Sequence, residues 1–169
     1  MNIRKRIIVR LFELSEQFYT RHFKKNKQPW QLSRDELLTY DESSFGRHLG
    51  LFLLENNFQL IPKVERHDAY HVLTGYGTKV EDEIALQYLC FGNGKRSPYL
   101  FGVIVIGTLL LPDYIPYYRR SFRRGKHAHA FHNWDFQKLL KTPITELRQA
   151  VFPKAYIAQL RKSIQVSLK

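Results

Sequence analysis

The chain has 169 residues, a length typical of one domain, and we treat residues 1–169 as a single domain. Its 44% apolar and 14% aromatic residues can form a core, which excludes a mainly disordered chain. Cys90 is the single cysteine. One cysteine excludes a disulfide framework and zinc sites built from several thiolates, so we expect Cys90 to be a small buried side chain. The formal charge of +12 predicts an anionic partner: nucleic acid, an anionic membrane surface or a phosphorylated substrate.

The first predicted element is an amphipathic helix within residues 1–28. Between Ile3 and Phe23, apolar residues recur at helical spacing, while most basic residues fall on other faces. Such a helix can pack on the domain or lie in a membrane interface, and we slightly favour packing. No apolar run or cleavage site typical of a secretory signal follows the basic start.

The middle of the chain carries clear helix boundaries. Ser33 and Glu36 form a capping box for a short helix, and Ser43 or Ser44 can cap the next one, which stops at Asn56. A further helix is predicted from Pro62 to Gly75 or Gly77. Three acidic residues then open a helix that breaks at a Gly-Asn-Gly sequence: Glu81, Asp82, Glu83 and residues 92–94.

Residues 99–111 are strongly apolar but too short to cross a bilayer, and their periodicity does not separate helix from strand. A basic run follows at 119–126. Residues 134–140, a capped start at 142–146 and an amphipathic stretch at 152–168 are predicted to be helical. Because no run of alternating strands is present, the sequence predicts an all-α bundle of short helices around one core.

One cluster can carry chemistry. On a helix, His67 and His71 lie about 40° apart and one turn apart, and Asp68 lies about 60° beyond His71. If the next helix packs antiparallel, Glu83 lies roughly level with His71. Two imidazoles and two carboxylates suit a divalent metal such as zinc, iron or manganese. The alternative is structural, with two partly buried histidines and Asp68 paired to Arg66.

The pattern His67-Asp68-x-x-His71-x11-Glu83 resembles the signature of the coenzyme Q (ubiquinone) biosynthesis protein 4 family. Residues 71–77, the Glu83–Leu86 segment and the Phe45-Gly46-Arg47 triplet are similar to that family too, as is the segment from Trp134 to Arg148. The resemblance covers residues 43–150. Since eukaryotic members carry a longer N-terminal region with mitochondrial targeting, the chain looks like a bacterial-type homologue.

The resemblance implies a mostly helical, peripheral membrane protein of ubiquinone biosynthesis. It implies a divalent metal held by His67, Asp68, His71 and Glu83, with zinc foremost and iron, manganese or magnesium as alternatives. It implies an apolar tunnel for a polyprenyl lipid or quinone precursor, which residues 99–111 could line. It also implies oxidative decarboxylation at ring C1 or, as the alternative, a non-enzymatic scaffold for other quinone-biosynthesis proteins.

Other expectations follow from single features. Tyr70 and Tyr76 flank the predicted site, and an anion or lipid headgroup could bind the basic run through Arg119, Arg120 and Arg123. A second histidine group, which we rank low as a metal site, comprises His127, His129 and His132.

Three further assignments complete the sequence-based picture. His48 and Asp113 lack the spacing of a His-Asp phosphohydrolase, and no nucleic-acid recognition motif accompanies the charge, so no nucleic-acid partner is expected. We expect a homo-oligomer. We expect it on the cytoplasmic face of the inner membrane or, alternatively, at the mitochondrial inner membrane.

Overall fold

The computed structural model describes residues 3–11, 28–62 and 64–167, with side chains up to residue 160. These residues form helices, and the described part of the chain contains no strand beyond one isolated bridge between Ser44 and Pro143. The predicted all-α class is therefore confirmed. Residues 3–11 are helical, and the remainder of the predicted N-terminal helix lies outside the described residues.

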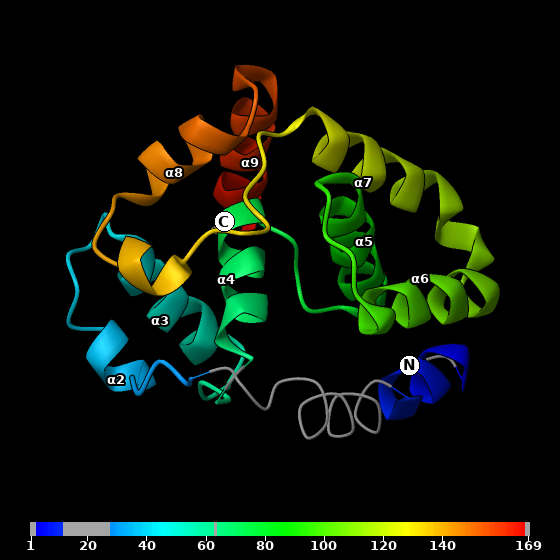
Figure 1. The fold of residues 1–169 in the computed structure, drawn as a ribbon, viewed down its shortest axis with the longest axis horizontal. Helices are drawn as coiled ribbons and strands as arrows, with labels where there is room; N and C mark the ends of the chain where they lie inside the picture. The colour runs from blue at the N-terminus through cyan, green and yellow to red at the C-terminus, as the bar shows by residue number, and fades with distance from the viewer. Residues whose placement is uncertain (1–2, 12–27, 63, 168–169) are drawn as a thin grey trace.

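The helices fall into two groups (Figure 1). In the first group, α2 packs on α3, α3 on α4, α4 on α8 and α8 on α9. In the second, α5 contacts α6 and α7, and the short 3-10 turn η1 links the last two. The first group comprises α2 (Arg34–Leu37), α3 (Phe45–Glu55), α4 (Glu65–Thr74), α8 (Ile144–Val151) and α9 (Lys154–Ser167). The second comprises α5 (Val80–Gly92), α6 (Pro98–Leu110), η1 (Pro112–Tyr114) and α7 (Ile115–His127).

Helix boundaries follow the capping residues. The reciprocal Ser33–Glu36 capping box is present at α2, and the Ser44 hydroxyl accepts a hydrogen bond from the Arg47 amide at 3.1 Å to cap α3. Helix α4 ends at Gly75, whose φ of 74° lies in the left-handed region that glycine enters without strain. The predicted ends of these helices are thus confirmed.

The apolar stretch around residues 99–111 is helical. Ser97 caps α6 by accepting from the Leu100 amide, and Pro98 occupies the first turn, where its missing N–H costs no hydrogen bond. Leu100, Val103 and Gly107 face the core, whereas Val105 and Leu109 are 56% and 76% exposed. The composition did not reveal this exposed side because apolar residues surround the whole helix.

Two predicted elements differ from the structure. Residues 134–140 contain only a 3-10 turn, η2 (Phe136–Leu139), because the chain bends there to insert Phe136 against Phe45 and Tyr70. The last helix begins at Lys154, after Phe152 turns into the core.

The tightest helix contact joins α5 and α7. A methyl group added to Gly125 would lie 1.9 Å from the Leu89 carbonyl oxygen, and one added to Gly92 would lie 2.2 Å from that of Phe122. Only glycine permits this backbone approach. The contact fixes α5 against α7 in the second group.

No helix in the described segments is by itself long and apolar enough to span a membrane. The segments Pro98–Leu110 and Pro112–His127 reach the required length only as a pair, bent by 104°.

Candidate metal centre

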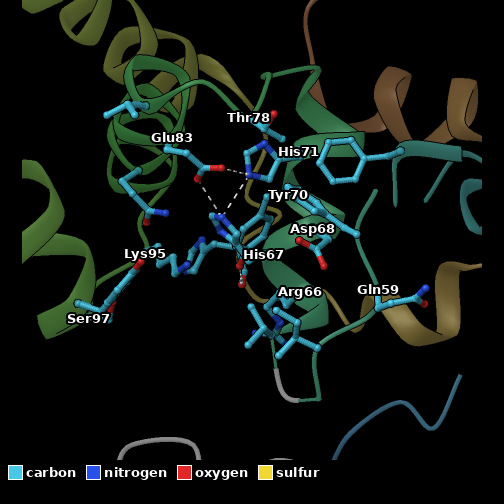
Figure 2. Close-up of a pocket in the computed structure, with 18 of the residues that line it drawn as sticks. Gln59, Arg66, His67, Asp68, Tyr70, His71, Thr78, Glu83, Lys95 and Ser97 are labelled. Carbon is cyan, nitrogen blue, oxygen red and sulfur yellow. Dashed lines mark hydrogen bonds and ion pairs between the residues drawn. The ribbon is translucent and has the colours of Figure 1, made fainter. Parts of the chain in front are cut away.

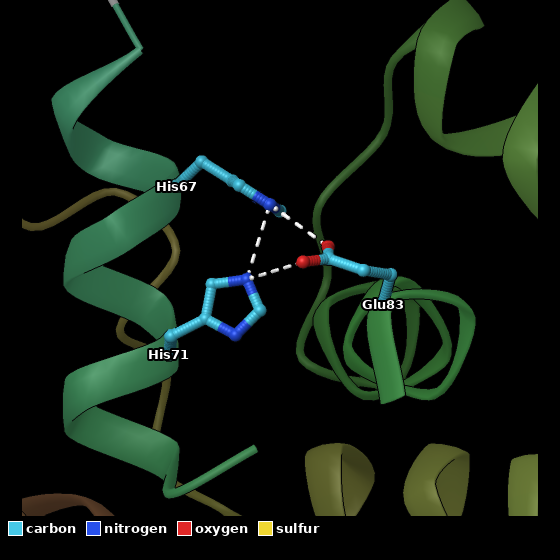
Figure 3. Close-up of side chains that lie close together, drawn as sticks. All are labelled: His67, His71 and Glu83. Atoms are coloured by element: carbon cyan, nitrogen blue, oxygen red, sulfur yellow. Dashed lines mark hydrogen bonds and ion pairs between the residues drawn. The ribbon is translucent and has the colours of Figure 1, made fainter. Parts of the chain in front are cut away.

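The site lies where the two helix groups face each other. Helix α4 presents His67 and His71 from successive turns, and the first turn of α5 presents Glu83 (Figure 3). The His67 Nε2 atom lies 3.0 Å from Glu83 Oε2, and the His71 Nε2 atom lies 3.2 Å from Glu83 Oε1. The two Nε2 atoms are 3.1 Å apart. Three potential ligand atoms thus surround one point.

These separations fit a shared ion. Ligands held about 2.0–2.1 Å from a tetrahedral zinc ion lie roughly 3.3–3.4 Å from one another. The observed 3.0–3.2 Å spacing needs only a small expansion to accept such an ion. Two imidazoles and one carboxylate form a donor set typical of catalytic zinc and non-haem iron sites, which keep further positions open. The residues present therefore fit a divalent metal.

Electrostatic interactions keep Glu83 ionised, the form in which a carboxylate binds a metal. Burial would raise the pKa of its carboxyl, but attraction to the imidazoles of His67 and His71 outweighs burial and lowers the pKa well below its usual range. Burial would lower the pKa of His71, yet the same carboxylate outweighs it and raises the pKa. Without a metal ion, the two shifts favour a protonated, positively charged His71 beside an ionised Glu83. A metal ion would take the place of the proton on His71.

A second layer of contacts orients His71. Its Nδ1 atom lies 3.1 Å from the Tyr76 carbonyl oxygen, so an Nδ1 proton is donated there and leaves Nε2 to face Glu83. The Phe52 ring stacks on the imidazole with centroids 5.4 Å apart. The left-handed Gly75 turns the chain so that the Tyr76 carbonyl reaches back. His71, only 2% exposed, is therefore held in one orientation.

Asp68, the fourth predicted ligand, lies outside the group of three. In Figure 2 its carboxylate points away from the His67–His71–Glu83 group, although the residue lines the same cavity. Its charge still reaches the site, because Asp68 contributes to the raised pKa of His71. The 100° advance per residue explains the difference: Asp68 is rotated too far from His67 to share one point with it.

A cavity of about 1050 Å³ opens beside the three ligands (Figure 2). Its wall includes apolar side chains from both helix groups, among them Phe52, Phe58, Val64 and Val80. Residues 99–111 were predicted to line a groove, but Tyr99 alone of that stretch is among the lining residues. The cavity wall instead comes mainly from residues 57–64, α4, α5 and the 94–97 turn.

The two tyrosines predicted to flank the site have side chains in different pockets. Tyr70 lines the cavity, and its hydroxyl donates to the His132 carbonyl at 3.1 Å. The Tyr76 side chain lies in a different, smaller pocket of about 310 Å³ and donates to Ser121 at 2.7 Å. Tyr76 contacts the His67–His71–Glu83 cluster, called the metal group below, through its backbone carbonyl.

The predicted basic run is remote from the metal group. Arg119, Arg120 and Arg123 are exposed on α7, and none lines the cavity. The second histidine group does not assemble among the described residues, since the potential metal site found there comprises His67, His71 and Glu83 alone. His132 lines the cavity, whereas His127 and His129 are exposed. Cys90 is fully buried, as predicted.

Sequence reasoning missed Lys95 and Arg66 as cavity residues. Both line the cavity with the metal group. Arg66 adjoins His67 in the sequence, which was a usable signal, whereas Lys95 reaches the cavity only through the turn after α5 and had no local signal.

Comparison with known proteins identifies the family of this chain. Residues 58–152 match the family model described as coenzyme Q (ubiquinone) biosynthesis protein Coq4. The chain is 32% identical over 118 residues to the mitochondrial ubiquinone biosynthesis protein COQ4 of Clavispora lusitaniae, a match covering 60% of this chain and 37% of that protein. The fold resembles a crystal structure from Nostoc punctiforme PCC 73102 that is provisionally assigned to ubiquinone biosynthesis.

The TM-score to that structure is 0.61 at 19% identity, over 89% of this chain and 82% of the other. This neighbour supports the fold alone. The family model, in contrast, covers more than half of the chain and includes all of His67, Asp68, His71 and Glu83. The chain belongs to the Coq4 family of coenzyme Q (ubiquinone) biosynthesis proteins.

Proposed function

We propose that this chain acts in ubiquinone biosynthesis by binding a polyprenylated quinone precursor in the cavity beside a divalent metal. The observation that carries the proposal is the convergence of His67, His71 and Glu83 at 3.0–3.2 Å on the wall of a cavity of about 1050 Å³. Family membership supplies the pathway, and the donor set favours zinc or iron over magnesium, which prefers oxygen ligands.

The reaction we propose is oxidative decarboxylation at ring C1. The carboxyl group leaves as CO2 and a hydroxyl group replaces it; O2 supplies that oxygen atom, and a two-electron donor reduces the second oxygen atom to water. A metal held by His67, His71 and Glu83 would supply Lewis acidity, and redox chemistry if it is iron. Asp68 lines the cavity and could exchange a proton with the bound precursor.

The protein's own residues prepare this step. The Tyr76 carbonyl fixes the His71 tautomer, and Phe52 limits rotation of its ring. Apolar wall residues such as Phe58 and Val64 can cover an aromatic ring and exclude water from it. The two helix groups thus contribute the ligands from opposite sides and enclose the reacting group between them.

The test combines elemental analysis with turnover. Protein purified without added metal is expected to hold about one equivalent of zinc or iron, and metal-loaded protein to release CO2 from a prenylated 4-hydroxybenzoate when O2 and a reductant are present. His71→Ala should lose both properties. Absence of CO2 release with zinc, iron and manganese alike would contradict catalysis.

A membrane-bound scaffold is the second candidate, favoured by the exposed face of α6. Phe101, Val105, Ile106 and Leu109 are 38–76% exposed there. Ile3 and Ile7 are also exposed, in the helical residues 3–11, and the Arg4–Asp113 ion pair of 2.9 Å joins this segment to η1, just after α6. A basic chain with such a patch suits the surface of an anionic membrane, where other quinone-biosynthesis proteins and further copies of this chain could assemble.

Vesicle flotation tests this role. Leu109→Ser combined with Val105→Ser should reduce binding to anionic vesicles severalfold, whereas Glu55→Ser on α3 should not. If His71→Ala keeps full vesicle and lipid binding but loses turnover, the metal serves catalysis. If neither activity nor binding depends on the metal, the scaffold alone remains.

A further inference from the structure

A lysine and an arginine share the cavity with the metal group. Lys95 lies on the turn between α5 and α6, and Arg66 lies on α4 beside His67 (Figure 2). The Lys95 ammonium lies 4.7 Å from the centroid of the Tyr70 ring. Both side chains are half-buried. The turn and α4 therefore bring two cations to the cavity from the two helix groups.

The Lys95 backbone is held rigidly. Its amide donates to the Cys90 carbonyl at 3.0 Å, and the next residue, Arg96, donates through its guanidinium to the carbonyls of Phe91 and Lys95 at 2.7 and 2.8 Å. The Arg96 guanidinium also lies over the Phe91 ring, 4.2 Å from its centroid. The Arg96 guanidinium thus holds the turn in place, although the residue also lines the cavity, and Lys95 faces the cavity beside it.

Asn93 joins the same turn to residues 129–132 through hydrogen bonds. Its Oδ1 atom accepts from the amides of Phe131 and His132 at 3.0 and 3.2 Å, and its Nδ2 atom donates to the His129 carbonyl at 3.0 Å. Among the described residues, the buried Nδ1 atom of His132 has no hydrogen-bond partner. A polar atom without a partner on a cavity wall is a position that a bound ligand could satisfy.

The Lys95 ammonium has no anionic partner in the described part of the chain. No carboxylate there lies within ion-pair distance of it. Burial lowers the pKa of Lys95, and the positive charge of Arg66 lowers it further. A half-buried cation near a second cation is unfavourable unless an anion occupies the space between them and the rest of the wall.

The charges around the cavity favour an anionic ligand. Glu83 and Asp68 supply two negative charges, and Arg66, Lys95 and Arg96 supply three positive ones. A divalent ion at the metal group would add two more positive charges. The loaded cavity is then positive overall, which suits a ligand with a negatively charged polar end.

We propose that Lys95 and Arg66 form an oxyanion-binding subsite that holds a carboxylate or phosphate on the polar end of the bound molecule. Held there, the polar end lies beside the metal group, while the remainder of the ligand contacts the apolar wall. The inference rests on the proposed function for the identity of the ligand, but the subsite itself is defined by the two cations.

Binding of small anions to metal-free protein tests the subsite. We expect 4-hydroxybenzoate or inorganic phosphate to bind the parent protein, and the neutral 4-hydroxybenzamide to bind more weakly than the benzoate. Lys95→Met keeps an apolar stem against Tyr70 but removes the charge, and should weaken anion binding about tenfold, the value of one charge-assisted hydrogen bond. Lys95→Arg should retain binding within about twofold, since it keeps the charge.

Arg66→Gln should weaken binding by a similar factor, and it serves as the second variant if Lys95→Met fails to fold. Arg123→Gln, which removes one exposed cation from α7, should bind as the parent protein does. If only benzoate binding depends on Lys95, the subsite binds a carboxylate. If only phosphate binding depends on Lys95, the subsite binds a phosphate. Equal binding of both anions by the parent protein, Lys95→Met and Arg66→Gln, or no binding by the parent, would overturn the proposal.

Metal affinity is measured on the same samples. Lys95-dependent anion binding by a protein that binds no metal would leave the subsite standing while the proposed function fails. Metal binding by every variant, with anion binding indifferent to Lys95, would remove the subsite and leave the metal centre intact.

Discussion

Helix α5 meets α7 and α4 in opposite ways. Against α7 the backbones approach so closely that Gly92 and Gly125 have no room for a methyl group. Towards α4 it presents Glu83 to His67 and His71 on the wall of a cavity of about 1050 Å³. One interface is closed by packing, and the other is kept open and joined by charged and polar groups. A helix fixed firmly on one side can thus hold a ligand accurately on the other.

The largest expected effect lies at the open interface. His71→Ala should lower affinity for zinc or cobalt by more than about 100-fold, because losing even a supporting partner of a ligand costs about 10–100-fold. Competition with a chromophoric chelator measures this. His127→Ala is the matched control, since His127 is exposed on α7 and lies outside the cavity, with its Nδ1 atom 2.7 Å from the Arg123 carbonyl oxygen. Equal affinity in the two variants would exclude His71 as a ligand.

At the interface of α5 with α7, added side-chain volume should lower the stability of the protein. Gly125→Ala forces a methyl group against the Leu89 carbonyl and should lower the free energy of unfolding by about 3 kcal/mol, within the upper range for overpacking. Gly102→Ala on α6 has nothing within 4 Å of the added methyl and should be neutral or stabilising by up to about 1 kcal/mol. Urea denaturation of both variants measures the difference. Similar unfolding midpoints would show that α5 and α7 are not held so closely.

The pH dependence distinguishes the open interface with and without metal. In metal-free protein the raised pKa of His71 adds stability that is fully present below its unfolded value of about 6.5 and is lost as pH rises through the folded value. A metal requires the neutral imidazole, so its binding strengthens over the same rise. The increase in melting temperature on adding zinc should therefore grow from pH 5.5 to pH 8 by about several degrees. A constant increase would contradict metal binding through His71.

The smallest effect is expected for Glu81, which lies in the first turn of α5, two positions before Glu83. Glu81 occupies the first turn of α5 with Glu83 but pairs with Lys5 at 2.8 Å. Glu81→Gln should leave metal affinity unchanged and alter stability by less than about 1 kcal/mol. Calorimetric metal titration and a thermal melt measure the two quantities. Loss of metal affinity in this variant would mean that the first turn of α5 is arranged differently.

The periodicity of an α-helix predicted part of the site correctly. His67 and His71 face one point because four residues complete about one turn. Glu83 was predicted from antiparallel packing of the next helix and again from the family resemblance, and the Gly75 turn explains how the chain reverses between the two helices. Asp68 was predicted from its helical position and from the same resemblance, but a rotation of about 100° from His67 directs it away from the other three.

Composition did not reveal which cations lie at the cavity. The basic residues at 119–126 stay a prediction for an anion or lipid headgroup: α7 buries Tyr118, Ser121 and Gly125 against its neighbours and leaves Arg119, Arg120 and Arg123 exposed, away from the cavity. The cations at the cavity, Arg66 and Lys95, are separated by 29 positions and show no local pattern. Residues 99–111 showed a similar ambiguity, because uniform hydrophobicity does not state which side meets the core.

The sequence alone determined the helical class, most helix boundaries and the pairing of His67 with His71. These depend on local rules: capping side chains, glycine at a left-handed turn, and 3.6 residues per turn. Tertiary structure decided that Asp68 stands apart, that Lys95 joins Arg66 beside the metal group, and that α6 exposes Leu109. Those outcomes depend on which face each helix turns towards its neighbours and on how the two groups of helices are placed against each other, which no local pattern encodes.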